Sequence, residues 1–194
     1  MARDWLADSR SEVAADRILD AAAQLFTKRD AATVGMNEIA KAAGCSRATL
    51  YRYFENREAL HTAFVNREAY RLHRELSDEI RGVQDPAQRL VAGITGALKM
   101  VRSSPALASW FAMTQAPIGG EMAEQSEVIT ALTAAFLSSL GSHDPAVVER
   151  RARWLVRVIT SLLLFPGTDE TDERQMLTEF VVPIAVSGSR VPGI

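Results

Sequence analysis

The placement of helix-breaking residues is the feature of this 194-residue chain that most restricts its fold. All seven prolines lie at Pro86 or later, and the only glycines before Gly82 are Gly35 and Gly44. A segment so poor in breakers, and rich in Ala, Leu, Glu and Arg, is typical of closely spaced helices. Because no segment shows the alternation of a strand, the sequence predicts an all-α fold of about nine helices.

Apolar residues that recur every three or four positions, together with capping residues, give the bounds of the expected helices. Gly35, Ser46 and Asn56 are expected at helix N-termini, and Gly44 at a C-terminus. Pro183 should kink or end the last helix. The predicted ranges are Ser11–Thr27, Met36–Ala43, Arg47–Phe54, Arg57–Arg81, Pro86–Arg102, Pro105–Met113, Glu121–Leu140, Pro145–Phe165 and Glu170–Ser187.

The composition excludes several classes of protein. Hydrophobic residues make up 47% of the chain and charged residues 24%, which excludes a wholly disordered or fibrous chain. The single cysteine, Cys45, cannot form an internal disulfide and fits a reducing compartment. The segment Met1–Arg10 lacks the pattern of a signal peptide, and the most apolar run, Trp154–Phe165, is too short to cross a bilayer. We therefore expect a cytoplasmic protein.

Residues 36–54 have the composition of a helix-turn-helix and read M-N-E-I-A-K-A-A-G-C-S-R-A-T-L-Y-R-Y-F. Two short helices would flank the turn at Gly44, with the small Ala40 and the apolar Leu50 at their contact. In such a motif the second helix enters the major groove, where its N-terminal residues meet base edges. Taken alone, the pattern also fits an ordinary αα-hairpin.

The second helix of this motif carries side chains suited to DNA. Arg47 can offer two parallel donors to guanine, and Ala48 is small enough to pack on a thymine methyl group. Lys41 and Arg57 flank the helix and are suited to phosphates, as are the free N–H groups at helix N-termini. The predicted DNA-binding residues are Lys41, Ser46, Arg47, Ala48, Thr49, Tyr51, Arg52, Tyr53 and Arg57.

The net charge of −2 is unevenly distributed along the chain. From Lys41 to Arg57 there are four basic residues and one acidic residue, a net charge of +3, which leaves −5 for the remainder. A basic segment attracts DNA phosphates, whereas an acidic remainder disfavours nonspecific contact. The charge pattern therefore predicts that DNA binds at the motif.

The run T-V-G-M-N-E-I-A-K-A-A-G-C-S-R-A-T-L-Y-R-Y-F-E-N-R-E-A-L closely resembles the DNA-binding domain of TetR-family transcriptional regulators. The preceding I-L-D-A-A-A-Q-L-F resembles that family's first helix, and the resemblance covers about Val13 to Phe64. The chain departs from the residues that are common in the family at four positions. Cys45 stands where valine is common, Ala48 where glycine is common, and Arg57 where lysine is common. Gly35 replaces the usual Ser or Thr cap. Each departure keeps size or charge approximately, although the residues at 47 and 48 leave the operator sequence open.

The resemblance implies a homodimer that places the recognition helix of each subunit in successive major grooves of a palindromic operator. It also implies an N-terminal arm at residues 1–10, a DNA-binding domain at 11–57 and an effector-binding and dimerisation domain at 58–194. The expected function is that of a repressor released by a small apolar or aromatic ligand, which must bind the two states with different affinity. An activator on the same scaffold, or a small-molecule-binding protein without DNA binding, are the alternatives.

The C-terminal region has no motif that identifies its ligand. Aromatic and thioether side chains predict an effector pocket, although the same residues could form plain core. These residues are Met100, Trp110, Phe111, Met113, Leu132 and Phe136. By family analogy, two apolar stripes on the last two helices predict a symmetric dimer interface. The stripes comprise Trp154, Val158, Leu162 and Phe165, and Phe180 and Ile184.

The sequence contains no pattern typical of catalysis or metal binding. Its three histidines are scattered, and it has neither a nucleophile elbow nor a phosphate-binding glycine loop. We therefore expect no enzymatic activity, no cofactor and no metal. His61 could contact DNA or the domain interface, but an isolated histidine is more often structural. Cys45 is expected to be a small packed turn residue, since a redox switch would need exposure and a lowered pKa.

Overall fold

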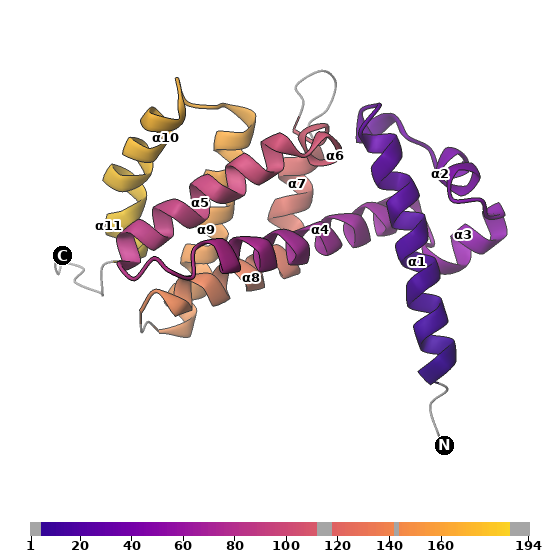
Figure 1. The fold of residues 1–194 in the computed structure, drawn as a ribbon, viewed down its shortest axis with the longest axis horizontal. Coiled ribbons are helices and arrows are strands. Elements are labelled where there is room, and N and C mark those ends of the chain that lie inside the picture. Colours follow the sequence, from indigo (N-terminus) through magenta and orange to yellow (C-terminus); the bar gives the residue numbers. More distant parts are fainter. Residues whose placement is uncertain (1–4, 112–117, 142–143, 187–194) are drawn as a thin grey trace.

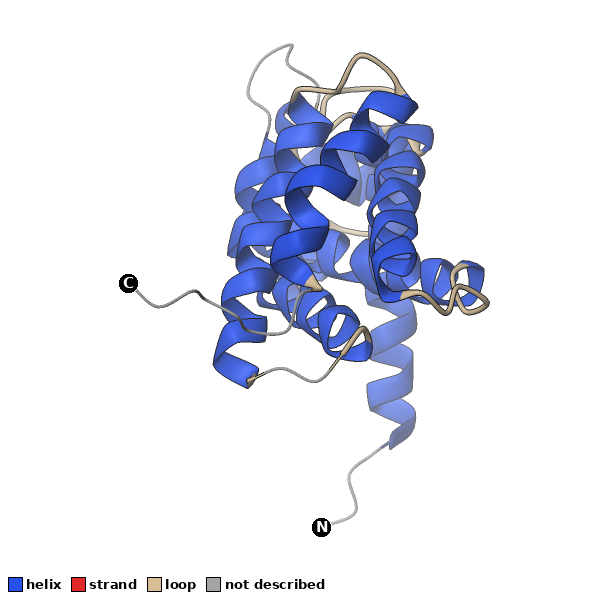
Figure 2. Ribbon diagram, turned by 90° about the vertical axis from the view of Figure 1, so that its left-hand side faces the viewer, coloured by secondary structure: helices blue, strands red, loops and turns tan. Residues whose placement is uncertain are grey.

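The computed structural model describes residues 5–111, 118–141 and 144–186. Every regular element in these ranges is helical, which confirms the predicted fold class (Figure 2). The N-terminal elements are α1 (Trp5–Phe26), the 3-10 helix η1 (Ala31–Thr33), α2 (Met36–Ala42), α3 (Arg47–Tyr53) and α4 (Arg57–Glu79). They are followed by α5 (Pro86–Ser103), α6 (Pro105–Ala108), α7 (Ile118–Gln125), α8 (Glu127–Ser139), α9 (Pro145–Leu164), α10 (Glu170–Met176), the π-helical η2 (Leu177–Val181) and α11 (Val182–Ala185). None of the described helices combines the length and hydropathy that a membrane span requires.

The helices pack around two cores, and α4 extends from one to the other (Figure 1). The first core lies among α1, α2, α3 and the N-terminal half of α4, where Phe26, Ile39, Leu50 and Phe64 are fully buried. The second lies among α5, α8, α9 and the C-terminal helices. The C-terminal half of α4 contacts α5 and α8. One continuous helix of 23 residues therefore belongs to both parts of the molecule.

Ser126 divides the helix predicted for Glu121–Leu140 into α7 and α8. Its Oγ accepts a hydrogen bond from Ile129 N at 3.1 Å, as an N-cap does, and donates one to Asn66 Oδ1 of α4 at 2.9 Å. The described ranges consequently hold slightly more α-helical segments than the predicted nine. The break depends on a contact with α4, which the local sequence pattern does not reveal.

The last predicted helix continues past Pro183 with a local irregularity. In η2, Val182 N donates to Leu177 O, five residues back. The helix α11 then has Pro183 in its first turn, where the missing N–H removes no intrahelical hydrogen bond. Pro183 thus does not end the helical segment, which continues to Ala185 after the π-helical turn.

Candidate functional site

The predicted helix-turn-helix is formed by α2 and α3, and its turn depends on Gly44. The φ angle of this residue is +67°, in the left-handed region that glycine adopts readily. Cys45 N closes the turn by donating to Ala40 O at 3.0 Å, and Ser46 Oγ accepts from Thr49 N at 3.0 Å to cap α3. The half-buried Cys45 side chain packs against the first core. It is therefore a packed turn residue in this structure.

The side chains predicted to bind DNA remain accessible at this motif. The Arg47 guanidinium lies 5.8 Å from the ring centroid of Tyr51, and that of Arg52 lies 5.2 Å from the centroid of Tyr53. Such cation–π contacts restrict the two cations at the surface of α3. The exposed members of the predicted set are Lys41, Ser46, Arg47, Ala48, Tyr51, Arg52 and Arg57, and the half-buried ones are Thr49 and Tyr53.

Arg57, predicted to meet a phosphate, also has a partner within the chain. Its Nη1 donates to Ala32 O of η1 at 2.9 Å and so links α4 to the segment before α2. Asn56 caps α4 next to it by accepting from Ala59 N at 2.7 Å. A guanidinium has five donor N–H groups, so the bond to Ala32 leaves others for a phosphate.

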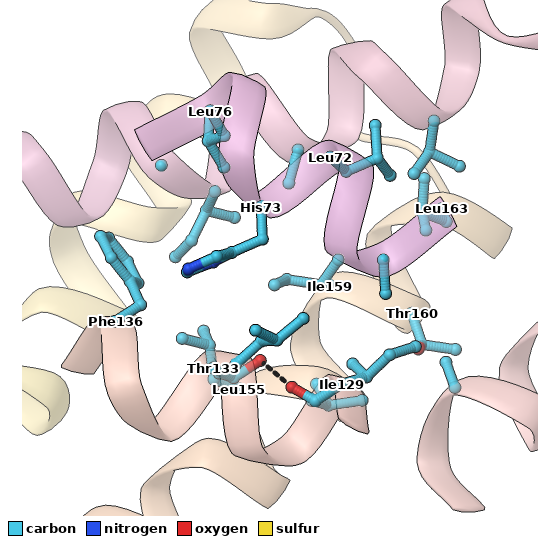
Figure 3. Close-up of a pocket in the computed structure, with 18 of the residues that line it drawn as sticks. Leu72, His73, Leu76, Ile129, Thr133, Phe136, Leu155, Ile159, Thr160 and Leu163 are labelled. Carbon is cyan, nitrogen blue, oxygen red and sulfur yellow. Dashed lines mark hydrogen bonds between the residues drawn. The ribbon is translucent and has the colours of Figure 1, made fainter. Parts of the chain in front are cut away.

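An apolar cavity of about 200 Å³ lies between α4, α5, α8 and α9 (Figure 3). Leu72 and Leu76 of α4 line one side, and Ile159 of α9 lies across from them. Among the described residues that line the cavity, none is Lys, Arg, Asp or Glu. Its polar side chains are those of His73, Ser77, Thr133 and Thr160.

The predicted pocket residues separate into two groups. Those that line the cavity are Phe111, Leu132 and Phe136. Trp110 is buried in the first core with 1% of its surface exposed, and borders only a smaller neighbouring cavity of about 90 Å³. Met100 is not among the residues that line the larger cavity, and Met113 lies outside the described residues.

No pocket residue was predicted on α4, and Met100 was the one predicted on α5, although both helices shape the cavity. Leu72 and Leu76 of α4 and Ile80, which directly follows that helix, recur every four residues, a spacing that could have indicated an inward face. On α5 two glycines leave space for the side chains opposite. A Cβ atom at Gly93 would lie 2.7 Å from Phe136 Cζ, and one at Gly96 would lie 2.6 Å from Leu76 Cδ1.

Known proteins resemble both the motif and the whole chain. Residues 18–64 match the family described as bacterial regulatory proteins, tetR family. The uncharacterized HTH-type transcriptional regulator Rv1255c of Mycobacterium tuberculosis strain H37Rv is 66% identical over 186 residues, which cover 96% of this chain and 92% of that protein. The chain belongs to the TetR family of transcriptional regulators.

Solved structures share the arrangement of this TetR-family chain. The repressor AlkX from Dietzia sp. strain DQ12-45-1b is 28% identical with a TM-score of 0.63, and the match covers 86% of this chain and 92% of AlkX. RolR in complex with resorcinol is 15% identical with a TM-score of 0.71, over 92% of this chain and 90% of RolR. At that identity the likeness to RolR concerns the fold alone.

The two stripes predicted for the dimer interface differ in exposure. Exposed fractions of 65%, 60% and 49% are found at Phe165, Phe180 and Ile184. Half-buried side chains that pack against the second core are those of Trp154, Val158 and Leu162. Arg151 Nη1 donates to Ala185 O at 3.3 Å, so α9 and α11 lie next to each other. The most exposed of the predicted interface residues therefore lie just after α9, on η2 and on α11.

Trp110 lies where the DNA-binding helices of the TetR-family chain meet the remainder. Its ring centroid is 5.4 Å from that of Phe26, 5.5 Å from that of Phe64 and 4.9 Å from that of His61. The next residue, Phe111, lines the cavity. Trp110 therefore belongs to the first core, and Phe111 both packs against that core and lines the cavity.

The buried His61 predicts a pH dependence of stability. Burial, assisted by the positive charge of Arg57, lowers the pKa of His61 from 6.5 to about 4. The unfolded chain therefore takes up a proton below pH 6.5 while the folded chain does not. We expect this group to lower the free energy of unfolding by about 2 kcal/mol between pH 7.5 and pH 5. Urea unfolding of wild type and His61→Leu at both pH values would measure the contribution, and an equal pH dependence in the two proteins would contradict it.

Proposed function

We propose that this TetR-family regulator is a cytoplasmic repressor that binds a palindromic operator as a homodimer and is released by a small apolar ligand. The observation that carries the DNA-binding part is the exposed surface of α3, where Arg47, the first residue of the helix, lies beside the ring of Tyr51. The N-terminal residues of a recognition helix are the ones that reach base edges. Lys41, Arg52 and Arg57 surround them as cations for the phosphates.

In this proposal, the effector binds in the cavity between α4, α5, α8 and α9. AlkX is described as a repressor implicated in the biodegradation of n-alkanes, and the RolR structure is a complex with the ligand resorcinol. An n-alkane is apolar, and resorcinol is aromatic. The apolar lining of the cavity favours a ligand of similar character. A ligand there contacts α4, which also carries residues of the first core, and Phe111, which follows Trp110. Ligand binding would thereby alter the position of the recognition helix.

Replacing Arg47 with alanine tests the assignment of base contacts. We expect specific binding to weaken by about 1–3 kcal/mol, or about 5- to 150-fold, if the guanidinium contacts guanine through two hydrogen bonds. Affinity for unrelated DNA should change much less. A gel shift with the DNA flanking the protein's own gene, and with a scrambled duplex of equal length, measures both quantities.

Arg81→Ala is the matched control for Arg47→Ala, because it also removes one exposed arginine. Arg81 follows the C-terminal end of α4 and pairs only with the exposed Asp78 in the described structure. This variant should bind operator and scrambled DNA as wild type does. If Arg47→Ala weakened both duplexes equally, Arg47 would act through charge alone and not through base recognition.

A further inference from the structure

We propose that the effector is an uncharged, largely apolar molecule that carries a hydroxyl group, and that His73 binds this hydroxyl. The inference rests on the proposed function, because that function places the effector in the cavity of α4, α5, α8 and α9. The proposal is supported by the chemistry of the side chains that line the cavity.

The side chains that line the cavity exclude a charged ligand. Among the described residues around the cavity there is no Lys or Arg to pair with a carboxylate or phosphate, and no Asp or Glu to pair with a cation. A charge buried without a partner is costly. The charge of any ligand would therefore have to remain outside the cavity, and the part bound inside must be neutral.

The volume of the cavity limits the size of that neutral part. A dry cavity of about 150 Å³, lined by leucine, isoleucine and phenylalanine, accommodates benzene in another protein. The present cavity, at about 200 Å³, has a similar lining and is moderately larger. It therefore suits a single ring with a short alkyl chain, or an aliphatic chain of comparable volume.

Two of the four polar side chains in the lining already donate their hydroxyl protons to the backbone. Ser77 Oγ donates to His73 O at 2.6 Å, and Thr133 Oγ1 donates to Ile129 O at 2.8 Å, the bond drawn in Figure 3. Each bond closes a turn of the residue's own helix. These hydroxyl groups therefore have little left to offer as donors to a ligand.

The imidazole of His73 is different. It extends from α4 into the cavity, toward the space between Phe136 and Ile159 (Figure 3). Neither of its ring nitrogens has a hydrogen bond to another residue of the described part of the chain. An imidazole can donate and accept hydrogen bonds, and a hydroxyl group can do both in return. A hydroxyl on an otherwise apolar ligand would thus complete the polar contacts of the cavity.

Thr160 is the remaining polar side chain of the lining and the alternative partner for the hydroxyl group of a ligand. Its methyl group lies toward α7, because a Cβ atom built at Gly120 would be 3.0 Å from Thr160 Cγ2. Thr160 lies on α9, on the opposite side of the cavity from the helix that carries His73 (Figure 3). Thr160→Val removes this hydroxyl with almost no change in volume and so distinguishes the two possible partners.

The test is calorimetric titration of the full-length protein, without DNA, with three probes of nearly the same shape: 4-propylphenol, propylbenzene and 4-propylbenzoate. We expect wild type to bind the phenol about 10-fold or more tightly than the hydrocarbon, since a lost hydrogen bond leaves the imidazole unpaired. The benzoate should bind more weakly than both. In His73→Leu the preference for the phenol should fall below about threefold, whereas Thr160→Val should retain it.

Binding of propylbenzene to His73→Leu shows that the variant is folded and that its cavity is intact. The proposal is overturned if wild type prefers the benzoate, if it binds phenol and hydrocarbon equally, or if none of the probes binds. It is also overturned if the preference persists in His73→Leu. Gel shifts with operator DNA distinguish a failure of this inference from a failure of the proposed function. If wild type binds the operator but shows no preference for the phenol over the hydrocarbon, only this inference is contradicted. Binding of the phenol without release of DNA contradicts only the proposed regulation.

Discussion

Trp110→Ala is expected to lower the free energy of unfolding by about 3–5 kcal/mol, because it removes the largest side chain of the first core. The ring is 1% exposed and contacts Phe26, Phe64 and His61, so its removal leaves a cavity that these neighbours fill only in part. Urea unfolding followed by circular dichroism would measure the loss. The helices of the DNA-binding part should unfold at the lowest urea concentration, since their core is the one affected.

Tyr70→Ala provides the comparison for Trp110→Ala. Tyr70 lies on α4 with 53% of its surface exposed, so its removal should change the free energy of unfolding by less than about 1 kcal/mol. A loss below about 1 kcal/mol for Trp110→Ala as well would mean that the two parts of the molecule do not pack together through this residue in solution.

Arg102→Ala is expected to cost about 3 kcal/mol of stability, because it leaves the buried carboxylate of Glu173 without its cation. Arg102 Nη1 and Nη2 donate to the two oxygens of Glu173 at 2.8 and 2.7 Å, and Nη2 also donates to Leu162 O at 2.8 Å. The Glu173 side chain is 4% exposed and accepts one further bond, from Gly167 N at 3.0 Å. These bonds join α5, α9 and α10. Thermal and urea unfolding of the variant would measure the cost.

The ion pair between Arg102 and Glu173 also predicts how the stability lost in Arg102→Ala depends on pH. The hydrogen bonds from Arg102 hold the pKa of Glu173 below its ordinary value of 4.5. The stability that the pair contributes is thus complete above pH 4.5 and is lost as the pH falls through the lowered pKa of the folded state. The difference between wild type and Arg102→Ala should therefore narrow in acid. Arg81→Ala, which breaks an exposed pair with Asp78, should cost less than about 1 kcal/mol at any pH.

The sequence was sufficient to predict the helix-turn-helix, because its determinants are local. Gly44 supplies the left-handed turn, and Ser46 and Asn56 cap the helices that follow them. Each acts within four residues of its own position. The break at Ser126 could not be predicted in the same way, since the cap is accompanied by a hydrogen bond to Asn66, 60 residues earlier.

The cavity was only partly predictable, for a related reason. Three large apolar residues that line the cavity could be recognised in the sequence by their size: Phe111, Leu132 and Phe136. A pocket also requires small residues opposite the large ones. Gly93 leaves space for the ring of Phe136 because α8 packs against α5, and the sequence does not show which helices are neighbours. Trp110 and Phe111 are both large aromatic residues in the sequence, yet Trp110 is buried in the first core, whereas Phe111 packs at the edge of that core and lines the cavity. The DNA contacts and the effector stay predictions that the experiments above address, and the dimer interface also stays a prediction.

The different positions of Trp110, buried in the first core, and Phe111, which lines the cavity, have a consequence for how this protein can diverge. Substitutions at Phe111 alter the cavity wall while the first core keeps its tryptophan, so ligand preference can change without loss of the DNA-binding fold. Deleting one residue just before Trp110 would instead move Phe111 toward the core and take the aromatic wall from the cavity. Within this segment we therefore expect related proteins to vary in residue type at the cavity position while they keep its length.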